Sequence, residues 1–180
     1  LISYLRGREI LLVLDNFEYL IESSDVLTEI LQLAPSVKML VTARERLSLR
    51  EEWLYAVAAL PIPTTTQDAG DFVAVRLFAQ SARRVQPDFD LDANLSDVID
   101  VCALVGGVPL ALELAASWVR VMSPAQIVKE IERGLDILTS SLRNVPERHR
   151  SMRAVFESSW RMMTDMERQV FRRLSIFQGG

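Results

Sequence analysis

The sequence predicts a mixed α/β region followed by an almost entirely helical region. Two short apolar runs, at residues 10–14 and 37–41, enclose a segment with helical spacing at 24–34. Strand, helix and strand in this order form a βαβ unit, in which the strands are parallel and the crossover is right-handed. From Asn94 onward, apolar residues recur at helical spacing, which predicts helices. We therefore expect the α/β fold class, with a change of domain near residues 62–70.

The first apolar run reads ILLVL and is followed directly by Asp15. A continuous apolar run of this length is typical of a strand that is buried on both faces of a parallel sheet. Asp15 then lies at the carboxyl edge of the sheet, where open α/β folds bind ligands. Two interpretations are open. Asp15 is an acid that holds Mg²⁺ through water, as in a Walker B motif, or it caps the following helix.

The second apolar run, VKMLV, is followed by Thr42-Ala43-Arg44. Because both strands run in the same direction, Arg44 and Asp15 are expected to leave the sheet at the same edge. A cation and a carboxylate that converge at such an edge suit a phosphate–Mg²⁺ group. The alternative is a surface arginine at the start of another helix.

The rest of the chain predicts one more strand and then helices. The run WLYAVAAL at 53–60 predicts a third strand, and the turn-rich residues 61–70 form a connector. Capping boxes are expected where Ser123 and Thr164 are each followed three residues later by Gln or Glu. Cys102 falls on the apolar face of its helix, so we expect a core residue and not a reactive thiol. The predicted helices lie at 71–85, 95–105 and 110–121, after Ser123, at 150–163 and after Thr164.

The composition narrows the classes of protein that the chain fits. With 180 residues, a net charge of −4 and a pI near 5.1, it lacks the basic character of a general nucleic-acid binder. The only cysteine is Cys102, so no disulfide framework exists and a cytoplasmic location is expected. No apolar run approaches the roughly 18 residues that a membrane span needs.

Four motifs follow one another in the chain: LLVLDNFE at 11–18, LVTARERL at 40–47, GGVPLALELAA at 106–116 and the stretch at 147–180. Together they resemble the signal-transduction ATPases with numerous domains, the STAND or NB-ARC-like class of P-loop ATPases. The likeness is greatest to the bacterial AfsR- and LuxR-type transcription regulators of this class, and it covers essentially the whole chain.

The resemblance implies three domains. Residues 1–65 are then the C-terminal half of a P-loop NTPase domain, whose parallel sheet carries the Walker B and sensor 1 motifs. Residues 66–145 are an all-α helical domain with a GxP motif. Residues 146–180 are the start of a winged-helix domain.

The resemblance also implies roles for residues at the sheet edge. Asp15 matches the Walker B acid, which positions Mg²⁺ through water. Arg44, preceded by Thr42, matches the sensor arginine that reads the γ-phosphate of a bound nucleotide. Many ATPases carry a catalytic acid directly after the Walker B acid, but this chain has Asn16, which cannot take a proton. Glu18 is the nearest carboxylate that would act in its place.

In the helical region, Pro109 matches the proline of the GxP motif, whose loop packs against the base and sugar of the nucleotide. Gly107 and Leu110 flank this proline. The family's P-loop, G-x-x-x-x-G-K-[ST], is absent, since no glycine in the chain is followed by lysine. The family places this loop upstream of Asp15, so we expect the chain to be a piece of a longer protein.

The implied function is that of a nucleotide-dependent switch in a regulator of transcription or signalling. The parent protein would bind ATP or ADP with Mg²⁺ and act as a slow ATPase at most, whereas this piece alone would bind nucleotide very weakly and hydrolyse none. Its expected partners are the upstream P-loop segment, further copies of itself on activation, and sensor and effector domains of the same chain. No membrane or nucleic-acid partner is expected. The alternatives are a degenerate nucleotide domain that scaffolds other proteins, and DNA binding by the arginine-rich C-terminal helices.

Overall fold

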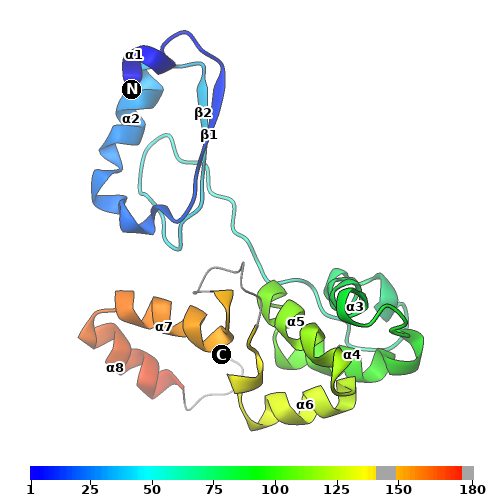
Figure 1. Cartoon of the computed structure of the whole chain (residues 1–180). Helices are drawn as coiled ribbons and strands as arrows, with labels where there is room; N and C mark the ends of the chain where they lie inside the picture. Colours follow the sequence, from blue (N-terminus) through cyan, green and yellow to red (C-terminus); the bar gives the residue numbers. More distant parts are fainter. Residues whose placement is uncertain (141–148, 176–180) are drawn as a thin grey trace. The chain divides into compact units, whose positions relative to one another are not determined.

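The computed structural model describes residues 1–140 and 149–175, apart from the side chain of residue 158. The chain divides into two compact units, Leu1–Val57 and Ala58–Gly180. Figure 1 shows the helices and strands of both units.

The first unit is built around a βαβ motif. Strands β1 (Ile10–Leu14) and β2 (Val37–Val41) are parallel and pair in register from Ile10 with Val37 to Leu14 with Val41. Between them lie two 3₁₀ turns, η1 (Phe17–Tyr19) and η2 (Ile21–Ser23), and helix α2 (Asp25–Leu33). A short helix, α1 (Ile2–Leu5), precedes β1. The predicted strand–helix–strand order is confirmed.

One face of this small sheet is covered and the other is not. Helices α1 and α2 lie against the covered face (Figure 1), where Leu5, Ile30 and Val37 belong to one buried cluster. On the opposite face, the side chains of Leu11 and Val13 are 61% and 60% exposed. The prediction that the first strand is buried on both faces is therefore wrong, since no described residue of this unit covers the second face.

The predicted third strand at 53–60 is also wrong, because these residues form no strand in the structure. Trp53, Tyr55 and Val57 are 95%, 89% and 88% exposed. A strand needs a neighbour for its backbone hydrogen bonds, and β1 and β2 are the only strands paired in the described residues. No helix begins near Arg44 either, so Arg44 is not the first residue of a helix.

The second unit is helical. Its α-helices are α3 (Val73–Val85), α4 (Leu95–Leu104), α5 (Pro109–Ala116), α6 (Pro124–Arg133), α7 (Met152–Met162) and α8 (Asp165–Leu174). The 3₁₀ turns are η3 (Ala69–Asp71), η4 (Asp92–Asn94), η5 (Ser117–Arg120) and η6 (Leu135–Ile137). The helix expected at 110–121 is shorter than predicted, because the chain tightens from α5 into η5 at Ser117.

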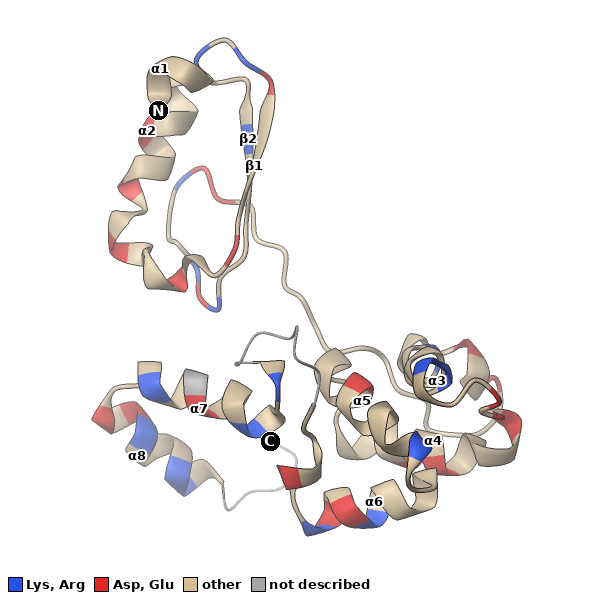
Figure 2. Cartoon of the chain, in the orientation of Figure 1, with Lys and Arg blue, Asp and Glu red and all other residues tan. Residues whose placement is uncertain are grey.

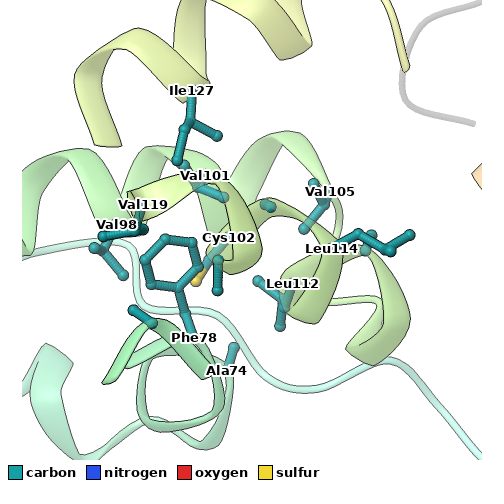
Figure 3. Packing of buried hydrophobic residues seen from close by; sticks show 14 of the residues in the cluster. Ala74, Phe78, Val98, Val101, Cys102, Val105, Leu112, Leu114, Val119 and Ile127 are labelled. Carbon is teal, nitrogen blue, oxygen red and sulfur yellow. The ribbon is translucent and has the colours of Figure 1, made fainter. Parts of the chain in front are cut away.

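The core of the second unit joins helices α3, α4, α5 and α6. Phe78, Cys102, Leu112 and Ile127 come from these four helices in turn and are fully buried (Figure 3). Each large apolar side chain buried in this way contributes roughly 1.5–3 kcal/mol relative to an exposed one. The prediction that Cys102 is a core residue is confirmed.

Both predicted capping boxes are present. The side-chain oxygen of Ser123 accepts a hydrogen bond from the backbone N–H of Gln126 at the start of α6, and the Gln126 side chain accepts one from the N–H of Ser123. Thr164 and Glu167 do the same at the start of α8. These bonds satisfy N–H groups that have no partner inside the helix.

Helices α7 and α8 form a hairpin around three aromatic rings. The ring of Phe156 stacks on that of Trp160 at 5.7 Å between centroids, and the ring of Phe171 lies 5.9 Å from Phe156. The hairpin joins the other helices through an antiparallel bridge between Thr139 and Ser151. Within the described residues, no helix is both long enough and apolar enough to cross a membrane.

Candidate functional site

The two strands of the first unit end side by side, and their last backbone hydrogen bonds bring the following residues together. The N–H of Thr42 donates to the carbonyl oxygen of Leu14 at 2.9 Å. The N–H of Phe17 then donates to the carbonyl oxygen of Thr42, also at 2.9 Å. The pairing thus continues past β1 and β2, and it fixes Asp15 and Thr42 next to each other at the carboxyl edge of the sheet.

Both carboxylate oxygens of Asp15 accept hydrogen bonds. The hydroxyl of Thr42 donates to Oδ1 at 2.5 Å, and Nδ2 of Asn16 donates to Oδ2 at 2.7 Å. The backbone N–H of Asn16 donates to the Thr42 hydroxyl at 3.1 Å. Asn16 takes a left-handed conformation with φ 58°, which asparagine tolerates better than most residues. The Asp15 carboxylate is therefore held in one orientation from two sides.

This arrangement limits what Asp15 can bind. Among the described residues, no group of three or more His, Cys, Asp or Glu side chains could hold a metal ion. A lone carboxylate suits Mg²⁺, which commonly binds through one or two carboxylates, with water and phosphate oxygens as its other ligands. A structural zinc or calcium site would need more protein ligands than this edge offers.

Glu18 and Arg44 form an ion pair. In the sequence, Glu18 lies three residues after Asp15 and Arg44 lies two residues after Thr42. Nε of Arg44 lies 3.4 Å from Oε1 of Glu18, and the side chains are 40% and 3% exposed. Turn η1 carries Glu18 inward, because the buried ring of Phe17 anchors the turn next to it. Sequence reasoning named both residues as candidates but did not predict that they pair.

The residues of the GGVP segment lie in the second unit. Gly106 and Gly107 have φ of 60° and 67° and end α4, and Pro109 is the first residue of α5. Leu110 is half-buried and packs against the core. The N–H of Leu60 donates to the carbonyl oxygen of Gly107 at 2.9 Å, so the segment holds the backbone just before the connector at 61–70.

The contact at Gly107 is too close for any side chain. A Cβ added to Gly107 would lie 2.1 Å from the carbonyl oxygen of Leu60, whereas a Cβ on Gly106 would meet nothing within 4 Å. Sequence reasoning missed Leu60, because a contact made by backbone atoms has no side-chain signature. The pair of glycines at a helix end was the only available signal.

Both basic and acidic residues occur along α7 and α8 (Figure 2). Arg153 pairs with Asp136 at 2.8 Å, and Arg168 pairs with Asp165 at 3.4 Å. Arg168 and Arg172 also lie over the ring of Trp160. Such mixed charge is typical of a solvated helix face. Arg143 and Arg148, which add to the basic character of the sequence, lie outside the described residues.

Comparison with known proteins connects the chain with transcriptional regulators. It is 34% identical over 179 residues to the protein named "Putative HTH-type transcriptional regulator Rv0890c" of Mycobacterium tuberculosis, an alignment that covers 98% of this chain and 19% of the relative. The corresponding protein of Mycobacterium bovis, "Putative HTH-type transcriptional regulator Mb0914c", matches with the same identity and coverage. A protein named "Uncharacterized protein Rv0894", from Mycobacterium tuberculosis, is 29% identical over 182 residues, which is 44% of its length.

The chain thus spans about a fifth of the length of the first relatives, with 19% of each covered. No model of a protein family matches the chain, and no solved structure matches it. The resemblance to the STAND ATPases therefore stays a prediction.

Proposed function

We propose that the chain is part of a nucleotide-dependent switch of the STAND class, within a multidomain regulator of transcription. The observation that supports this most directly is the Asp15–Thr42 pair at the carboxyl edge of two parallel strands, with Arg44 two residues further on. An oriented carboxylate and an arginine after neighbouring strands suit Mg²⁺ and a terminal phosphate. The names of the relatives support the connection with transcription.

In this proposal the domains are 1–65, 66–145 and 146–180. Asp15 holds Mg²⁺ through water, Thr42 orients Asp15, and Arg44 reads the γ-phosphate. Gly107, Pro109 and Leu110 form the loop that contacts base and sugar. An upstream segment supplies the P-loop, since the 180 residues contain no Gly-Lys pair.

Hydrolysis is expected to be slow at most. Asn16 follows Asp15 at the position where many ATPases carry a catalytic acid, and an amide cannot take a proton from water. The side chain of Glu18, the other candidate base, is 3% exposed and paired with Arg44. A general base must reach the proton that it removes, directly or through one water. Neither residue favours fast hydrolysis. Slow hydrolysis is what we expect of a nucleotide-dependent switch.

The test uses a longer protein that includes about a hundred residues upstream of Leu1. We expect ADP to remain bound through purification, and Asp15→Ala to weaken Mg²⁺-dependent nucleotide binding at least tenfold. Glu29→Ala is the matched control, since Glu29 is an exposed acid on α2 of the same unit. The proposal is wrong if the longer protein binds no nucleotide, or if both variants change binding equally.

A protein-binding scaffold built on a degenerate nucleotide domain is the second candidate. It is favoured by Asn16 and by the absence of a P-loop from these residues. The sequence upstream of Leu1 decides between the two candidates, because a scaffold needs no Gly-Lys-Ser/Thr motif and a nucleotide switch does.

A further inference from the structure

Glu18 is an unusual acid for its surroundings. Its side chain is 3% exposed, and its one described ion pair runs from Oε1 to Nε of Arg44 at 3.4 Å. The other oxygen, Oε2, is buried and accepts no hydrogen bond from the described residues. A buried carboxylate with an unsatisfied oxygen costs free energy. An apolar side chain at this position would avoid that cost.

The local backbone aims Glu18 at Arg44. The left-handed Asn16 turns the chain into η1 directly after Asp15. The Phe17 N–H bond to the Thr42 carbonyl oxygen then ties this turn to the end of β2. Glu18 directly follows Phe17, and Arg44 lies two residues after Thr42. The pair is therefore held by the same hydrogen bonds that hold Asp15 beside Thr42.

We infer that Glu18 is a positioning residue, whose buried carboxylate holds the guanidinium of Arg44 by its Nε so that Arg44 discriminates nucleoside triphosphate from diphosphate. This inference rests on the proposed function. The printed contact joins Oε1 of Glu18 to Nε of Arg44, and an arginine also carries two Nη groups. Those groups form the planar fork that matches phosphate oxygens.

Both acids of the site contact residues that follow β2. The oxygens of Asp15 accept hydrogen bonds from Thr42 and Asn16, whereas Oε1 of Glu18 faces Arg44. Thr42 and Asn16 thus hold the Asp15 carboxylate in place.

The experiment measures two affinities of the longer protein with the upstream residues, one for ADP and one for the non-hydrolysable β,γ-imido analogue of ATP, both with Mg²⁺. We expect Glu18→Gln to change ADP affinity less than twofold and to lower the preference for the ATP analogue about tenfold. Arg44→Lys keeps the charge but has no Nε–H, and it should lower the preference equally. The double variant should lower it no further, because both changes weaken the same contact between residues 18 and 44.

The matched control is Glu22→Gln, which removes an equal charge from an exposed acid in η2 and should leave both affinities unchanged. A merely structural role of Glu18 predicts that Glu18→Gln weakens both nucleotides equally, and that result overturns the inference. Loss of the preference in Arg44→Lys but not in Glu18→Gln also overturns it. Absence of any nucleotide binding by the unsubstituted protein instead overturns the proposed function, and the inference with it.

Discussion

The backbone of Leu60 lies directly on the backbone of Gly107, with the Leu60 N–H donating to the Gly107 carbonyl oxygen at 2.9 Å. The place that a Cβ of residue 107 would occupy is 2.1 Å from the carbonyl oxygen of Leu60. Gly107 thus fixes the position of the backbone at Leu60, just before the connector at 61–70. This contact gives the GGVP segment a structural role in the free chain, whatever it does with a ligand.

Gly107→Ala is expected to destabilise the helical unit more than Gly106→Ala. Both residues have positive φ, at 67° and 60°, so each alanine is strained by about 1 kcal/mol. Only at residue 107 does the new Cβ also collide with backbone, which adds a further cost of about 1–3 kcal/mol because a well-packed site cannot absorb extra atoms.

Chemical denaturation of the two variants, followed by circular dichroism, measures this difference. Limited proteolysis adds a local readout, since release of Leu60 from Gly107 should expose the connector to cleavage. Equal free energies of unfolding for the two variants would contradict the close contact.

Cys102 is expected to be unreactive in the folded chain. Burial raises the pKa of its thiol from 9.0 to about 11. Because the nucleophile is the thiolate, labelling with a disulfide reagent at pH 8 should be slowed about 100-fold or more relative to the unfolded chain. As the only cysteine, it reports directly on opening of the core.

The same shift makes a prediction about alkaline pH. A raised pKa means that the fold favours the neutral thiol, so this contribution to stability is complete below pH 9 and is lost as pH rises toward about 11. Cys102→Ala removes it. The difference in unfolding free energy between the two proteins should therefore shrink from pH 8 to pH 11, and a constant difference would count against the burial of the thiol.

Ser123→Ala is expected to lower the free energy of unfolding by about 1 kcal/mol, the usual cost of losing an N-cap hydrogen bond. The effect reaches the core because α6 carries the buried Ile127 and Ile131. Ser96→Ala is the control, since Ser96 is exposed in the first turn of α4, and it should change stability by less than about 0.5 kcal/mol. Equal effects would mean that the capping box contributes nothing.

The features that the sequence predicted are those set by residues close together in the chain. The capping boxes depend on residues three apart, and the βαβ unit depends on apolar spacing between clear helix and strand boundaries. The burial of Cys102 was predicted from the spacing of apolar residues within one helix. In each case, local chemistry and burial point to the same structure.

The features that sequence reasoning missed depend on distant parts of the chain. Leu11 and Val13 have the character of core residues, but their exposure is decided by what packs against that face of the sheet. Trp53 and Tyr55 belong to an apolar run that is typical of a strand, yet a strand exists only with a neighbour. For the site, the sequence placed Asp15 and Arg44 at one edge, but the pairing of Arg44 with Glu18 depends on the turn at Asn16.

The capping box of α8 predicts a pH dependence for the α7–α8 hairpin. The backbone N–H and the hydroxyl of Thr164 donate to Oε2 of Glu167 at 2.7 and 2.8 Å. These bonds, the backbone one first, hold the pKa of the Glu167 carboxyl below its ordinary value of 4.5. A lowered pKa means that the fold favours the carboxylate. The stabilisation is therefore complete above about pH 4.5 and is lost as pH falls through the lower pKa of the folded state.

Nuclear magnetic resonance titration of the Glu167 side chain measures this pKa directly. Thr164→Ser keeps the hydroxyl and should leave the value low, whereas Thr164→Val keeps only the backbone donor and should raise it part of the way toward 4.5. Glu167→Gln removes the titrating group, so the acid-induced loss of α8 helicity should be smaller in that variant. A pKa of 4.5 or above for Glu167 in the unsubstituted chain would show that the capping box does not form in solution, because a carboxylate that accepts two short hydrogen bonds must hold its proton less tightly than a free one.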